Sequence, residues 1–103
     1  MLDMIENKQI GINAMPFHIH PYANKEQWDE MFDWIPKDMW SQLDIEVGMQ
    51  HDVNGFPRAA ATRLLDRDIH YIWTGINPHW GGSPVEQPGA FWWKMPDDRK
   101  LLV

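Results

Sequence analysis

The clearest periodic pattern in the chain predicts an amphipathic helix over residues 24–35. Its apolar positions lie at i, i+3, i+4 and i+7 and are occupied by Trp28, Met31, Phe32 and Ile35. This spacing places side chains along one face of an α-helix. Asn24 is a favourable N-cap, and Gln27 three residues later completes a capping box. Pro36 cannot continue a helix, so we expect the helix to end there.

Other segments carry the alternation or composition of β-strands. Residues 44–51 place Ile45, Val47 and Met49 on one face, which predicts a strand with one solvated side. Residues 68–76 are rich in β-branched and aromatic side chains and predict a buried strand. Residues 90–95 predict a short last strand, and residues 10–22 predict one edge strand or two short ones.

Two further segments complete the predicted fold. Residues 37–43 predict a short second helical segment. Residues 57–65 allow either a helix with Ala60, Ala61, Leu64 and Leu65 on one face or a return strand after the turn at 52–55. The alanine run favours the helix. We therefore predict one α+β domain over residues 1–103, with an antiparallel or mixed sheet, one or two helices on one face and a long Gly/Pro/Trp-rich C-terminal loop.

Composition limits the class of protein. The chain has 103 residues, of which 44% are hydrophobic and 13% aromatic, and this favours one folded core. It has no cysteine, which excludes disulfides and cysteine-ligated zinc or iron–sulfur sites. No basic segment followed by an apolar run opens the sequence, and no run of about 18 apolar residues occurs, so we expect a cytoplasmic protein without membrane contact.

Charge is concentrated in one part of the sequence. The net charge is −6, and residues 25–46 contain seven acids and two lysines. Such a field repels nucleic acid and favours a partner with a basic surface. Asp29, Glu30 and Asp33 lie away from the apolar stripe of the predicted helix, so we expect them to face water and a partner. On the predicted helix at 57–65, Arg63 is spaced i, i+4 from Arg67, which favours an ion-pairing face.

Two histidines form the sharpest chemical hypothesis. On a strand, His18 and His20 would share one face, and His51 or His70 could supply a further ligand to a divalent metal such as zinc, iron or nickel. Ordinary solvated histidines are the favoured interpretation, so no cofactor is expected. Ser41 and Ser83 lie in no nucleophile motif, which favours a non-enzymatic role.

Seven tryptophans are more than a small core easily encloses. Trp28 and Trp73 fit predicted elements and are assigned to the core. In an extended chain Trp92 and Trp93 must point to opposite faces, so one can be buried while the other meets a partner. If the C-terminal loop folds back over the core as a lid, Trp80 would be the side chain that it buries. Trp34 lies off the apolar stripe of the predicted helix.

These observations favour an acidic accessory, adaptor or inhibitor protein that binds another protein. The predicted contact residues are Trp34, Trp80, Trp92, Trp93, Asp29, Glu30 and Asp33. A metal-binding protein or metal-dependent enzyme centred on His18 and His20 is one alternative. A small-ligand or carbohydrate-binding module is another. The sequence leaves homo-oligomerisation and the identity of the partner open.

Overall fold

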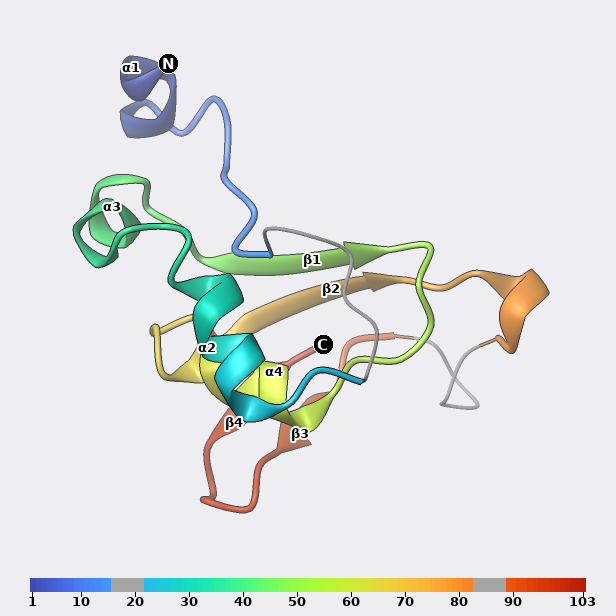
Figure 1. Cartoon of the computed structure of the whole chain (residues 1–103). Helices are drawn as coiled ribbons and strands as arrows, with labels where there is room; N and C mark the ends of the chain where they lie inside the picture. The colour runs from blue at the N-terminus through green and yellow to red at the C-terminus, as the bar shows by residue number, and fades with distance from the viewer. Residues whose placement is uncertain (16–21, 83–88) are drawn as a thin grey trace.

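The computed structural model describes residues 1–15, 22–82 and 89–103, and it confirms the α+β prediction. The α-helices in this part of the chain are α1 (Leu2–Glu6), α2 (Lys25–Phe32), α3 (Lys37–Gln42) and α4 (Arg58–Leu65). The strands are β1 (Val47–His51), β2 (Tyr71–Gly75), β3 (Trp92–Lys94) and β4 (Lys100–Leu102), and a 3-10 helix, η1, spans Pro78–Trp80. The sheet is mixed, in the order β1-β2-β4-β3 (Figure 1).

Helix α2 forms as predicted, although it ends earlier than Pro36. The capping box is present: the Asn24 side chain accepts from the Gln27 amide, and the Gln27 side chain accepts from the Asn24 amide, both at 2.9 Å. Phe32 is the last helical residue, and Pro36 caps the start of the predicted second helix, α3. Trp28 and Phe32 are buried, with ring centroids 6.1 Å apart.

Residues 58–65 form helix α4, as the alanine run favoured. Strands β1 and β2 are parallel, and parallel neighbours need a crossover, which α4 supplies. Its small residues Ala60 and Ala61 are fully buried. A Cβ atom on Gly48 would lie 3.0 Å from Leu64 Cδ1, so glycine at this position lets α4 approach β1 closely.

Strand β1 has the predicted single solvated side, but its larger apolar side chains lie on that side. Gly48 and Gln50 of β1 are buried, whereas Val47 and Met49 are exposed. The Gln50 amide tolerates burial because it donates to the carbonyls of Val53 and Gly55, at 3.0 and 2.8 Å. In β2 only one central side chain, Ile72, enters the core, so the expected buried strand is half solvated.

The C-terminal half of the sheet is a hairpin. The predicted last strand exists as β3, which pairs antiparallel with β4; neither β4 nor α1 was predicted. Arg99 in the connecting turn bonds to Asp97 and to Asp66 at the end of α4, which ties the turn to the helical layer. Of the strands expected at residues 10–22, the described part shows one parallel bridge, Asn13 to Val47, and residues 16–21 lie outside it.

Candidate protein-interaction surface

One face of the sheet carries large apolar side chains that no helix covers within the described part of the chain. Helices α2 and α4 pack together on the opposite face (Figure 1). We call this exposed surface the open face. It consists of Val47 and Met49 of β1, Tyr71 and Trp73 of β2, Leu102 of β4 and Trp92 of β3.

Strand register aligns these residues into two rows. Trp92 pairs with Leu102, Leu102 with Tyr71, and Tyr71 with Val47, so the first row crosses all four strands. The second row is formed by Met49 and Trp73, one step further along β1 and β2. Paired residues on neighbouring strands point to the same side of a sheet, so the two rows form one surface.

The open face is well exposed to solvent. Trp92 retains 60% of its accessible surface, Trp73 51% and Tyr71 47%. Isolated apolar side chains are normal on protein surfaces, but a contiguous patch of this kind is typical of a contact site. Tryptophan and tyrosine are also the residues most enriched among binding hot spots.

His51 closes one end of the open face. Its imidazole stacks on the Trp73 indole with centroids 5.6 Å apart and an interplanar angle of 4°. The register places His51 beside Gly75, and a Cβ atom on Gly75 would overlap the imidazole ring. Glycine at position 75 therefore makes the room in which His51 lies against Trp73.

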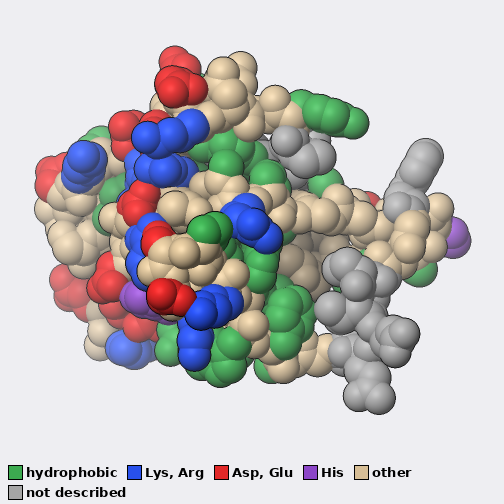
Figure 2. Space-filling view, turned by 90° about the horizontal axis from the view of Figure 1, so that it is seen from below, with side chains coloured by type: hydrophobic (Ala, Val, Ile, Leu, Met, Phe, Trp, Pro, Cys, Tyr) green, Lys and Arg blue, Asp and Glu red, His purple; other side chains and the backbone are tan. Residues whose placement is uncertain are grey.

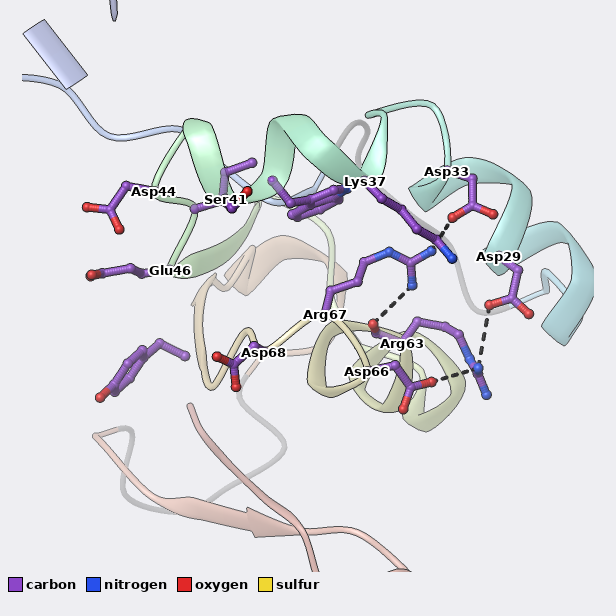
Figure 3. A pocket seen from close by; sticks show the side chains of 13 residues that line it. Asp29, Asp33, Lys37, Ser41, Asp44, Glu46, Arg63, Asp66, Arg67 and Asp68 are labelled. Atoms are coloured by element: carbon purple, nitrogen blue, oxygen red, sulfur yellow. Dashed lines mark hydrogen bonds and ion pairs between the residues drawn. The ribbon is translucent and has the colours of Figure 1, made fainter. Parts of the chain in front are cut away.

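A charged cleft of about 990 Å³ lies between α2, α3 and α4 and reaches the open face at Tyr71, which lines both (Figure 3). Arg63 of α4 pairs with Asp29 of α2 and with Asp66, while Arg67 pairs with Asp33. The predicted ion pairing of Arg63 and Arg67 is confirmed, although Arg67 lies in the turn that follows α4. The Arg67 guanidinium also lies 5.1 Å from the Phe32 ring centroid and 5.9 Å from that of Trp40.

This geometry corrects the picture of a free acidic helix. Asp29 and Asp33 neutralise two arginines that are largely shielded from solvent, while Glu30 is exposed. Asp44 and Glu46 line the other side of the cleft, away from both arginines (Figure 3). Figure 2 shows acidic and basic side chains interleaved on one side of the molecular surface, rather than a continuous acidic area.

The turn between β3 and β4 contains the groups with shifted pKa values. The hydrogen bond that Arg99 donates to Asp97 holds the pKa of that carboxyl below its ordinary value. Side-chain hydrogen bonds to Asp97, and to a lesser extent to Asp66, raise the pKa of Arg99. These shifts describe an exposed structural ion-pair network at the edge of the helical layer.

The predicted contact residues do not come together in one place. Trp92 and Trp93 diverge as expected: Trp92 lies on the open face, while Trp93 packs against the core. Trp80 belongs to η1, beyond the ends of β1 and β2, and Trp34 lies between α2 and α3 in the helical layer (Figure 1). The predicted lid includes residues 83–88, which lie outside the described part of the chain.

The described residues do not bring the proposed metal ligands together. His18 and His20 lie outside the described residues, and His51 stacks on Trp73. Among the residues that the structure does describe, no three His, Asp or Glu side chains are placed to hold a metal ion. His70 instead contacts the Asp68 carboxylate at 2.8 Å.

Sequence reasoning missed most of the open face. The prediction that Trp73 belongs to the core is wrong, because Trp73 is half exposed. Tyr71 and Met49 are not among the predicted contact residues. The available signal was the period of two along residues 71–73, which must place Tyr71 and Trp73 on the same side of a strand. Which side faces water depends on where α4 packs.

Comparison with known proteins provides no relative for this chain. No protein-family model, curated protein or solved structure matches it. None of the helices in the described ranges combines the length and apolar character needed to cross a membrane.

Proposed function

We propose that this chain is a protein-binding module, acting as an accessory, adaptor or inhibitor, and that its partner covers the open face. The observation that carries the proposal is the row of Val47, Tyr71, Leu102 and Trp92 across the whole sheet. Burying exposed apolar area stabilises a complex by about 25 cal/mol per Å², before the costs of association are subtracted. The row supplies such area on rigid strands.

Charge supports a partner with basic groups around an apolar centre. The chain has a net charge of −6, and Glu30 and Glu46 are exposed acids that form no ion pair within the described residues. Long-range attraction of this kind accelerates encounter, whereas the apolar contact holds the complex together. We assign the affinity to the open face and the steering to the acidic residues.

A comparison of tryptophan variants tests the proposal. The parent chain, the double variant Trp73→Ala/Trp92→Ala and the control Trp34→Ala are used to recover partners from native cells, and recovered proteins are purified for titration. Trp34 is a suitable control because it is 71% exposed and lies in the helical layer. We expect the double variant to weaken binding by about 2 kcal/mol or more, as for hot-spot residues. Equal binding by parent and double variant would refute the role of the open face.

A footprint on the complex gives an independent readout. Hydroxyl radicals oxidise exposed Met, Tyr and Trp side chains, and the open face contains Met49, Tyr71, Trp73 and Trp92. Binding should protect these residues and leave Trp34 and Met39 labelled as in the free chain. Protection confined to the helical layer would place the partner on the charged cleft instead.

A further inference from the structure

The two edges of the sheet differ in how their backbone groups are satisfied. At the β1 edge, the Asn13 side chain donates to the Met49 carbonyl at 3.0 Å and accepts from the Met49 amide at 2.7 Å. The Ala14 amide also donates to the Val47 carbonyl, at 2.9 Å. The Asn13 amide thus occupies the position that a peptide group of another strand would take, and this edge is closed.

The β3 edge has no such cover within the described residues. Phe91 and Val103 exchange two backbone hydrogen bonds of 2.9 Å, and the Met95 amide donates to the Arg99 carbonyl at 2.8 Å. Hydrogen-bonded and non-hydrogen-bonded pairs alternate in an antiparallel ladder. The amide and carbonyl groups of Trp92 and Lys94 therefore point away from β4, toward the outer edge.

We propose that a second copy of this chain pairs with the outer edge of β3, antiparallel, with Trp93 opposite Trp93 at the two-fold axis. In this register Trp92 exchanges both outward backbone hydrogen bonds with the partner's Lys94, and the symmetry repeats the pair. The two sheets become one, and the open faces of both copies lie on the same side. This inference concerns the sheet edge and does not depend on the proposed function of the open face.

Side-chain chemistry favours this register over its neighbours. Trp92 and Lys94 lie on the open-face side of β3, and Lys94 pairs with Asp98 of its own chain. In the proposed register each indole lies beside the partner's Lys94, so a cation–π contact adds to that ion pair. A lysine on an edge strand ordinarily hinders edge pairing. Shifting the register to bring two Lys94 side chains together would restore that repulsion, whereas centring it on Trp93 avoids it.

The distribution of charge favours a second copy as the occupant. Residues 91–103 contain three basic and two acidic side chains, although the whole chain is acidic. The acids concentrated in residues 25–46 belong largely to α2, α3 and the loop that follows, on other elements than the β3 edge. Two copies can therefore meet at β3 with less repulsion than at the acidic helices.

Directed disulfide formation tests both dimerisation and register. The chain has no cysteine of its own, and Trp92 and Lys94 are both exposed. Hydrogen-bonded opposite residues have Cα atoms about 5.5 Å apart, within disulfide range. On mild oxidation, a mixture of Trp92→Cys and Lys94→Cys chains should give several-fold more disulfide-linked dimer than either variant alone. Equal yields from the single variants, or no linked dimer, would overturn the proposal.

Sedimentation equilibrium of the full chain provides the second test. We expect a reversible monomer–dimer equilibrium for the parent. Lys94→Pro removes an outward amide without breaking a bond to β4, and it should weaken dimerisation by about tenfold or more. Lys94→Thr keeps the amide and is the matched control, expected to retain most of the dimer. A parent that stays monomeric, or a Lys94→Pro variant that dimerises like the parent, would contradict the inference; tryptophan fluorescence checks that each variant is folded.

Discussion

At the scale of single residues, amide side chains and glycines set local geometry in this protein. Asn13 satisfies the backbone of Met49, and Asn54 exchanges hydrogen bonds of 2.9 Å with the backbone of Asn77, joining the loops that follow β1 and β2. Buried Gln50 holds the first of these loops through two carbonyls. In each case a side-chain amide bonds to backbone groups that have no partner within the short strands.

The contact between His51, Gly75 and Trp73 gives a residue-scale prediction. Gly75→Ala should displace the His51 ring from Trp73, because the added Cβ atom occupies the space of the ring. We expect a change in Trp73 fluorescence and a stability loss of about 1 kcal/mol, since exposed His51 can move away. In a His51→Ala background the same substitution should cost less, which a double-mutant cycle by chemical denaturation measures. Identical costs in both backgrounds would contradict the clash.

At the scale of elements, β1 and β2 turn their larger side chains away from the helices. Their larger apolar side chains are exposed, because Leu64 of α4 lies against Gly48 and leaves little room for large side chains on the inner face. Ile72 faces the core beside Gly48, whereas Met49 and Trp73 face outward.

Neighbouring positions in these strands should therefore respond in opposite ways to truncation. Ile72→Ala should lower the free energy of unfolding by about 2–5 kcal/mol, as buried large-to-small changes do. Met49→Ala should lower it by less than about 1 kcal/mol, because Met49 is already in contact with solvent. Urea denaturation followed by circular dichroism measures both values. A larger loss for Met49→Ala than for Ile72→Ala would show that Met49, and not Ile72, faces the core.

Strand β3 separates the roles of its two tryptophans. Trp93→Ala should destabilise the fold by about 3 kcal/mol, because Trp93 packs against the core. Trp92→Ala should leave the melting temperature nearly unchanged and weaken partner binding by about 2 kcal/mol or more. Thermal melts and a binding titration on the two single variants check this. If both variants unfold, or neither affects binding, the pair serves packing alone.

At the scale of the whole molecule, the charged cleft lies among the helices and adjoins the open face at Tyr71. The ion pairs of Arg63 and Arg67 join α2 to α4 across the charged cleft, and the open face lies behind them on the sheet. A partner on the open face would approach through the field of the chain, whose net charge is −6.

Charge reversal can separate steering from stability. Glu30→Lys should slow association with a basic partner, and the difference should shrink at high salt, because Glu30 is exposed and forms no ion pair within the described residues. Glu6→Lys, the same change on α1, is the control and should have the smaller effect. Asp33→Lys should instead lower stability, since Asp33 pairs with Arg67. Stopped-flow association rates at two salt concentrations distinguish these outcomes. If the effect of Glu30→Lys on the association rate does not depend on salt, Glu30 does not contribute to electrostatic steering.

The sequence by itself determined the local elements. The capping box and apolar stripe specify α2, the alanine run specifies α4, and the adjacent tryptophans must diverge on β3, because each of these follows from backbone geometry over a few residues. The i, i+4 spacing of Arg63 and Arg67 indicated an ion-pairing face, but their pairing with Asp29 and Asp33 depends on how α2 packs against α4. Strand β4 was missed, since its three residues acquire strand geometry only by pairing with β3 and β2.

Only the tertiary structure decided which side of the sheet faces water. Alternation along a strand divides its side chains into two sets but does not say which set is buried. Here Gly48 and Gln50 are buried, although their neighbours Val47 and Met49 are more hydrophobic. That choice depends on α4 lying close to Gly48 and on carbonyl partners for Gln50 that the following loop brings near. The open face depends on register between strands far apart in sequence, and such long-range pairing is set by packing of the whole chain.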